Sequence, residues 1–390
     1  MRRRDFLSLI AAGAAAASAP RFVFAAPGED YRRLLILVEF KGANDGLNTV
    51  VPYADPAYYR LRPRLAIRRE EVVSLDERTG LHPALAPLLP LWQSGELALV
   101  QGLGYAAPNL SHFRSIEIWD TASNSAEYLG EGWLTRAFAQ APALPDFAAD
   151  GVIIGSPDLG PLAGGARTVA LSNPEQFLRQ ARLAHPVAAR GPAALSHLLR
   201  VEADIAQAAA QIGGGAAGSP GAAPLATAFP QNPFGNSVRA AAQVLASGAR
   251  VAAIRLTLTG FDTHQNQPGV HANLLRQFSE GMIALRSALI ELRRWDSTLV
   301  MSYAEFGRRA AENASMGTDH GTANAHFVTG GRVKGGLYGE PPRLDRLENG
   351  NLPFAVDFRS LYATALERWW GVNSQAVLRG RFAPLDFIRA

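Results

Sequence analysis

The chain has 390 residues, of which 48% are hydrophobic and 18% charged, a composition typical of a folded globular protein. A chain of this length can bury a substantial core without disulfide bonds. Because it contains no cysteine, disulfides, thiolate zinc sites and a cysteine nucleophile are excluded, and any metal must bind histidine, carboxylate or backbone oxygen ligands.

The formal charge of +4 is concentrated at the N-terminus. Within residues 1–25, four arginines face only Asp5, which gives a net charge of +3. The rest of the chain keeps 34 of the 38 basic residues and 33 of the 34 acidic residues, so it is close to neutral. This balance, without a clustered basic patch, argues against nucleic acid as a partner.

Residues 1–26 have the features of a twin-arginine signal peptide. Arg3 and Arg4 are followed by Asp5, then by an Ala-rich apolar run over 6–19, and the segment ends in small residues suited to cleavage near position 25 or 26. The apolar run is too short for a stable membrane span. We therefore expect a periplasmic or secreted protein, with an uncleaved N-terminal anchor as the alternative.

Beyond this leader, apolar runs of strand length alternate with helical stretches. The first strand is expected at 33–40 and is followed by the turn "KGANDGLN". Further strands are expected at 95–105, 151–155, 167–171, 250–264, 297–307 and 326–331. Helices are expected at 82–93, 174–183, 193–212, 234–246, 270–294 and 357–370.

This alternation predicts a three-layer α/β/α sandwich with a mostly parallel central sheet. We expect residues 30–390 to form a single domain. The stretch "GGGAAGSPGAAPLA" at 213–226 is of low complexity and is expected to be a surface excursion from it.

Polar donors follow several of the predicted strands, and more lie in the stretch "GTDHGTANAHF" at 317–327. The candidate metal ligands are Asp45, Asp262, His264, Glu305, Asp319, His320 and His326. The first four come just past strands, and parallel strands present their carboxyl ends at one edge of a sheet, so these four should converge. Carboxylate and imidazole ligands suit Zn²⁺, Mn²⁺ or Mg²⁺, as one ion or two.

Each of these residues also has a simpler explanation. Asp45 lies in an Asn-Asp-Gly turn, where aspartate commonly forms the turn. Asp262 could cap the following helix, and Glu305 could pair with Arg308 or Arg309. His271 belongs to the next predicted helix and is expected to be structural.

Ser111, in "NLSHFRSIEIW", is the candidate nucleophile. It precedes a helix-like segment, so its hydroxyl would lie at a helix N-terminus, where an alkoxide or a bound phosphate is favoured. The alternative is an ordinary N-cap serine. Its neighbour His112 is a second catalytic candidate, and Asn44 and Asn109 are candidates for contacting substrate oxygens.

Five segments carry a resemblance to a known family: "EFKGANDGLNTVVPY", "NLSHFRSIEIW", "GFDTHQNQ", "YAEFGRRA" and "DHGTANAHFVTGGRVKGG". Together they resemble the secreted proteins known as domain of unknown function 1501, over nearly the whole mature chain. The resemblance implies a twin-arginine leader and an alkaline-phosphatase-like fold, shared with sulfatases and cofactor-independent phosphoglycerate mutases.

The resemblance also implies site roles. Asp45 corresponds to the first metal ligand, Ser111 to the nucleophile, Asp262 with His264 to a later Asp and His pair, and His326 to the final histidine. Two departures stand out. Asp262 and His264 are two residues apart instead of four, and Glu305-Phe306 stands where an Asp-His pair is usual, which here occurs later as Asp319-His320.

The leading interpretation is an exported metal-dependent hydrolase or transferase that acts on a phosphate or sulfate ester, of a small molecule or a polymer, through a seryl intermediate. The alternative is a binding or assembly protein that keeps the fold with a degraded metal site. A polysaccharide-binding surface is a third interpretation.

Overall fold

The computed structural model describes residues 30–143, 146–171 and 225–389. The predicted leader at 1–26, the predicted helices at 174–183 and 193–212, and most of the excursion at 213–226 lie outside the described residues. Within the described part, none of the helices has the length and hydrophobicity of a membrane span.

A nine-stranded sheet forms the middle layer, in the order β11-β5-β10-β9-β1-β8-β6-β7, with β12 beside β5. Its strands are β1 (Leu34–Lys41), β5 (Leu97–Gly104), β6 (Ala149–Ile154), β7 (Thr168–Leu171), β8 (Val251–Thr259), β9 (Thr298–Tyr303), β10 (Asn324–Thr329), β11 (Gly336–Gly339) and β12 (Val356–Asp357). β1 runs parallel to β8 and β9, whereas β10 is antiparallel to both of its neighbours. The expected mostly parallel sheet is confirmed.

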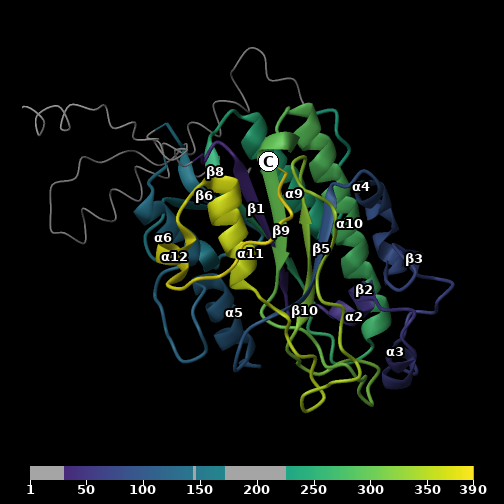
Figure 1. Cartoon of the computed structure of the whole chain (residues 1–390). Helices are drawn as coiled ribbons and strands as arrows, with labels where there is room; N and C mark the ends of the chain where they lie inside the picture. Colours follow the sequence, from purple (N-terminus) through teal and green to yellow (C-terminus); the bar gives the residue numbers. More distant parts are fainter. Residues whose placement is uncertain (1–29, 144–145, 172–224, 390) are drawn as a thin grey trace, which may run out of the picture.

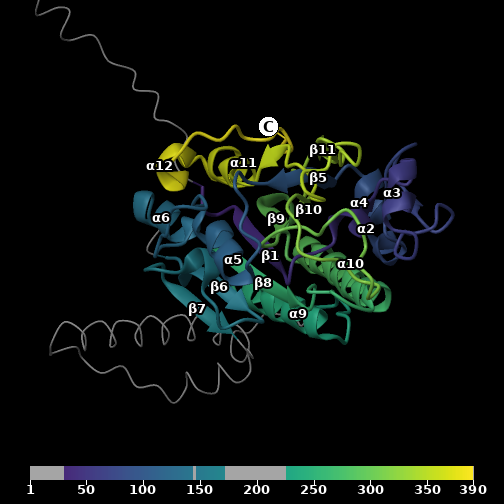
Figure 2. The same ribbon diagram turned by 90° about the horizontal axis from the view of Figure 1, so that it is seen from below.

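Helices cover both faces of the sheet (Figures 1 and 2). One face carries α5 (His112–Thr121), α6 (Trp133–Gln140), α11 (Arg359–Ala363) and α12 (Ser374–Leu378), and the other carries α4 (Leu89–Gln93), α9 (Pro233–Ala246) and α10 (Gln267–Glu291). Side chains alternate along each strand, so β1 contributes to the apolar core on both faces of the sheet. Ile36 and Val38 pack into one apolar cluster, and Leu35 and Leu37 pack into the other. The three-layer α/β/α architecture is therefore confirmed.

Two predicted helices are interrupted. The stretch 82–93 forms a 3-10 helix, η1 (Pro83–Leu88), followed by the short α4, because Pro87 and Pro90 lack the N–H groups that a continuous α-helix needs. The stretch 357–370 divides into α11 and a π-helix, η4 (Thr364–Trp370).

A small second sheet, β2-β4-β3, was not predicted. It consists of β2 (Val50–Val51), β3 (Val73–Ser74) and β4 (Gly80–Leu81), each too short for its periodicity to be read from sequence. In the sequence, the short helix α2 (Gly46–Thr49) precedes β2, and α3 (Pro56–Leu61) lies between β2 and β3.

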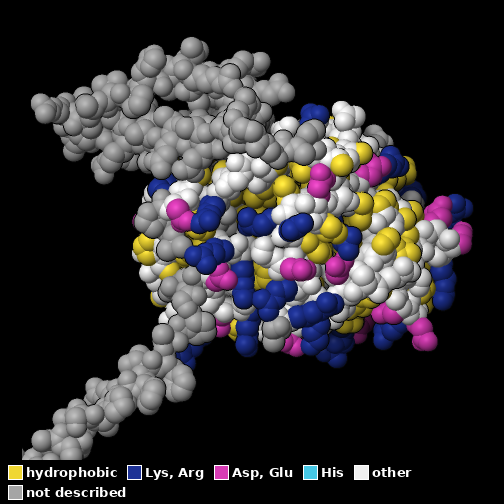
Figure 3. Space-filling model, turned by 90° about the horizontal axis from the view of Figure 1, so that it is seen from above, with side chains coloured by type: hydrophobic (Ala, Val, Ile, Leu, Met, Phe, Trp, Pro, Cys, Tyr) yellow, Lys and Arg dark blue, Asp and Glu magenta, His cyan; other side chains and the backbone are white. Residues whose placement is uncertain are grey.

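The order β9-β1-β8 is what positions the candidate site. These three strands are parallel neighbours, so the segments that follow them leave the sheet side by side at its lower edge in Figure 1. Figure 3 shows the opposite edge, where no histidine is visible among the described side chains.

Candidate metal centre

Four side chains, from the start of α5 and from the loops after β8 and β9, bring donor atoms close together. The Nε2 atoms of His112 and His320 are 3.0 Å apart, and those of His264 and His320 are 2.9 Å apart. The Oδ1 atom of Asp262 lies 3.4 Å from Nε2 of His112, 3.0 Å from Nε2 of His264 and 3.4 Å from Nε2 of His320. The four donors thus form two triangles that share the His320–Asp262 edge.

Each of the three imidazoles has its other ring nitrogen next to an oxygen acceptor. Nδ1 of His320 lies 2.8 Å from the carbonyl of Leu110, and Nδ1 of His112 lies 2.8 Å from Oε1 of Glu305. Nδ1 of His264 faces Oδ1 of Asp319 at 3.5 Å. With the ring protons on Nδ1, each proton meets an oxygen acceptor and the three Nε2 lone pairs face the shared centre, which is the form in which imidazole binds a metal.

This donor set fits a divalent cation. Imidazole nitrogens and a carboxylate oxygen that lie 2.9–3.4 Å from their neighbours in the cluster are donors that a divalent cation can take as ligands. The donor atoms of His112, Asp262 and His320 all lie within 4.8 Å of one another. Tetrahedral zinc with bonds of about 2.0 Å separates its ligands by about 3.3 Å, which is close to the distances within each triangle. Imidazole and carboxylate donors also bind Mn²⁺, whereas Mg²⁺ prefers oxygen ligands, so the three histidines favour zinc or manganese over magnesium.

Arg308 holds the carboxylate of this set in place. Its guanidinium is fully buried, and its Nη2 donates to Oδ1 of Asp262 at 2.6 Å. Nε also donates to the carbonyl of Ala43, and Nη1 to that of Thr318. Burial alone would raise the pKa of Asp262, but the hydrogen bond and charge of Arg308 outweigh it and keep that pKa below its usual value. Arg308 therefore connects the segments after β1, β8 and β9.

The electrostatic surroundings of two of the histidines differ. The hydrogen bond with Glu305 raises the pKa of His112, and partial burial opposes this. Partial burial, with the nearby charge of Arg308, lowers the pKa of His320. His320 thus favours the neutral form in which imidazole binds a metal.

Two predicted ligands lie behind histidines instead of facing the centre. Besides contacting His112, Glu305 is buried and accepts a hydrogen bond from the backbone N–H of Gly42 at 2.9 Å. Asp319 faces His264 and accepts from Nδ2 of Asn313 at 3.1 Å, a bond that lowers the pKa of Asp319. Carboxylates in this position orient metal-binding imidazoles and raise their basicity.

Asp45 is neutralised by an arginine. Its Oδ2 forms a buried ion pair with Nη1 of Arg62 at 2.6 Å and also accepts from the side chain of Gln267. Burial would raise the pKa of Asp45, but Arg62 outweighs it and lowers that pKa. The structure therefore does not bring Asp45 into the donor cluster, because Arg62 supplies the positive charge that a metal would otherwise provide.

His326 also lies elsewhere. It is fully buried in β10, where its ring packs edge-on against Trp119 and its Nδ1 lies 3.2 Å from Oγ of Ser302. Burial lowers its pKa to about 3, so it stays neutral. A position inside the apolar core explains why it does not join the other histidines.

Ser111 occupies the N-cap position of α5, but its hydroxyl makes no capping hydrogen bond, so it is not an ordinary N-cap serine. It is exposed and directly precedes His112. The side chain of Asn109 accepts from the backbone N–H of Ser111 at 2.9 Å and shapes this turn. Asn44, by contrast, is fully buried and contacts Thr49 and His271, so a substrate cannot reach it in this conformation.

Two functional residues were assigned differently from sequence. His112 was expected to act on substrate, yet its Nε2 belongs to the donor set, and Arg308 was considered only as a partner of Glu305. The role of His112 could have been anticipated from sequence. His112 begins the helix after Ser111, and that helix starts at the same edge of the sheet as the strand ends.

The fold and this cluster define an α/β protein with a histidine-rich candidate cation site at the carboxyl edge of a largely parallel sheet. The family model described as "Protein of unknown function (DUF1501)" matches residues 98–380, and the chain belongs to this family. No curated protein matches the chain.

Among solved structures, the chain is similar to the PsFucS1 sulfatase from Pseudoalteromonas sp., at 9% identity and a TM-score of 0.43, over 91% of this chain and 70% of that one. It is similar to the lipoteichoic acid synthase LtaP from Listeria monocytogenes at 11% identity and a TM-score of 0.38, over 90% of this chain and 76% of that one. It is also similar to an alkaline phosphatase from the Antarctic bacterium TAB5 at 12% identity and a TM-score of 0.31, over 79% of this chain and 94% of that one.

Proposed function

We propose that the protein is an exported metal-dependent hydrolase or transferase for phosphate or sulfate esters. The observation that carries the proposal is the convergence of three Nε2 atoms on the Asp262 carboxylate, with every Nδ1 directed to an oxygen acceptor. Imidazoles whose Nδ1 atoms lie next to oxygen acceptors have the orientation of metal-binding histidines. Export rests on the leader at 1–26, as expected from the sequence.

His112, His264, His320 and Asp262 would hold the ion, which when bound would act as a Lewis acid toward an ester oxygen. Glu305 and Asp319 keep two of these rings in the orientation that binds it. Arg308 has its donors committed to protein oxygens and acts by positioning Asp262.

Ser111 is our candidate nucleophile. Its hydroxyl is free of capping bonds and adjoins a donor residue, at the N-terminus of a ten-residue helix. Backbone N–H groups in a first helical turn favour negative oxygens, as on a phosphoryl or sulfuryl group. The Ser111 oxygen would bond to phosphorus or sulfur as the bond to the ester oxygen breaks, and the leaving alcohol would take up the proton that Ser111 loses. Water, or an acceptor alcohol in a transferase, would then break the bond to the Ser111 oxygen and return a proton to it.

The test begins with metal content, measured by inductively coupled plasma analysis of the exported protein. Zinc or manganese at one equivalent per chain is expected, and aryl phosphates and aryl sulfates are then screened. Ser111→Ala should keep the metal and lose turnover, whereas Ser94→Ala, at an exposed position after α4, should keep both. A metal-free protein that cannot be reloaded would overturn the proposal.

The pairing of Asp45 with Arg62 favours a second candidate, a binding or assembly protein without turnover, because one acidic group that the resemblance implies as a ligand is already neutralised. A preparation that binds metal but hydrolyses neither ester class with any ion, while a partner co-purifies, would support this candidate instead.

A further inference from the structure

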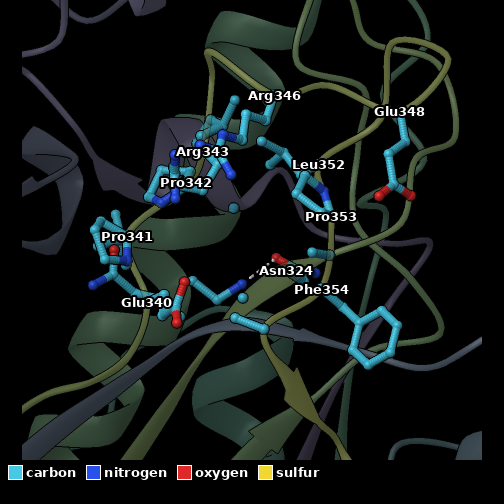
Figure 4. Close-up of a pocket in the computed structure, with 18 residues that line it drawn as sticks. Asn324, Glu340, Pro341, Pro342, Arg343, Arg346, Glu348, Leu352, Pro353 and Phe354 are labelled. Carbon is cyan, nitrogen blue, oxygen red and sulfur yellow. Dashed lines mark hydrogen bonds between the residues drawn. The ribbon is translucent and has the colours of Figure 1, made fainter.

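A separate cavity of about 380 Å³ lies at the same edge of the sheet and shares no residue with the metal centre. Its walls come from α2, β5, the start of β10 and the segment 340–355. Figure 4 shows Pro341, Pro342 and Arg343 on one side of it and Leu352 and Pro353 on the other. Asn324, also in the wall, donates to the carbonyl of Phe306 at 3.0 Å and so separates the cavity from the segment that carries Glu305.

One buried amide in this cavity lacks a partner. Gln101 is only 5% exposed, and within the described part of the chain its side chain makes no hydrogen bond. Strand alternation places it on the same face of β5 as Leu99, the face toward α2 and the cavity. Its amide atoms keep a small contact with solvent, so they are free to pair with a polar group that enters the cavity.

The floor around this amide is apolar. Leu47, Val50 and Leu352 are each less than a tenth exposed and line the cavity. Gly102 has a φ of +68°, and a Cβ there would lie 3.0 Å from Cβ of Ala355, so the covering segment approaches β5 closely at this point. An apolar cavity of about 150 Å³ accepts benzene, so this one has room for a molecule about twice that size.

The charges at the rim disfavour an anion. Arg343 and Arg346 line the cavity together with Glu340 and Glu348. Asp345 lies outside the lining but contacts both arginines, at 3.2 and 3.9 Å. The two arginines and two glutamates of the lining balance, and Asp345 also pairs with both arginines, so the rim offers a negatively charged ligand no net positive charge.

We infer that this cavity binds an uncharged small molecule with an aromatic or aliphatic body and one amide-like group that pairs with Gln101. The amide of the ligand and that of Gln101 each offer a donor and an acceptor, so they can form a complementary pair. The apolar body lies against Leu47, Val50 and Leu352. This site is independent of the proposed ester chemistry and requires no metal.

The experiment compares three probes of one shape on the full-length exported protein, by saturation-transfer NMR with a titration for each. The probes are 3-phenylpropionamide, 3-phenylpropionate and propylbenzene. The amide is expected to bind at least fivefold more tightly than either of the others, since only it satisfies Gln101 without adding charge.

Two variants locate the binding. Gln101→Leu should abolish the preference for the amide, and Ala355→Trp, at an exposed wall position, should block all three probes by filling the cavity. Gln93→Leu, at an exposed position in α4, is the matched control and should bind as the wild type does. Absence of binding by the amide, tighter binding of the carboxylate, or wild-type binding by both cavity variants would each overturn the inference.

Discussion

His320 is the histidine that the two donor triangles share, so its removal tests the candidate metal centre directly. In His320→Ala, both the 3.0 Å contact with His112 and the 2.9 Å contact with His264 lose their partner. Loss of an outer-shell partner alone weakens metal affinity about 10–100-fold. Loss of a direct donor should therefore raise the zinc Kd by at least about 100-fold.

The difference is measurable as stability. At a free zinc concentration of 100 times the wild-type Kd, the wild type gains about 2.7 kcal/mol in free energy of unfolding. With a Kd raised 100-fold, the variant gains about 0.4 kcal/mol at the same concentration. Urea unfolding at fixed free zinc, set by a competing chelator, resolves these two values.

The control is another histidine that sequence also suggested as a ligand. His326→Gln should weaken the apolar core around Trp119, yet it should leave the zinc-dependent gain within about 0.5 kcal/mol of the wild-type value. If His320→Ala keeps the full gain, or His326→Gln loses it, the reasoning that places the metal centre is wrong.

Three further predictions concern Glu305 and two charged groups elsewhere in the fold, Arg62 and Asp120, the second of which accepts a hydrogen bond from the hydroxyl of Tyr303 at 3.2 Å. Glu305→Gln removes the carboxylate behind His112 and should weaken zinc binding about 10–100-fold in a chelator competition, without unfolding the protein; unchanged affinity would mean that Glu305 does not support the centre. Arg62→Met leaves Asp45 buried and unpaired, so the free energy of unfolding should fall by about 3–5 kcal/mol in urea, and a loss below about 1 kcal/mol would contradict the ion pair. Burial raises the pKa of Asp120 to about 7, above its unfolded value near 3.9, so the folded state binds the extra proton and stability should fall as pH rises from about 4 to 7. Asp120→Asn should remove that part of the fall in urea midpoints between about pH 4 and 7, and an identical slope in both proteins would show that Asp120 does not titrate as described.

Sequence predicted most of the layer architecture, because local patterns decide it. The apolar runs at 33–40, 250–264 and 297–307 correspond to β1, β8 and β9, and the helical stretch at 270–294 corresponds to α10. The polar turns after these strands also indicated which edge would carry a site. The patterns failed where prolines interrupt the stretch 82–93 and where the strands of the small sheet have only two residues.

The assignment of roles within the site needed the tertiary structure. Asp45 and Asp262 both follow parallel strands and look equivalent in sequence. Arg62, the C-cap residue of α3, forms an ion pair with Asp45, whereas Asp262 faces the histidines. Which nitrogen of His112 points inward depends on Glu305, 193 residues away.

Local sequence thus determined the strands, the turns and the kinds of donor that this protein offers. The fold decided which donors meet and which are neutralised, because ion pairing and ring orientation depend on neighbours that come from distant parts of the chain.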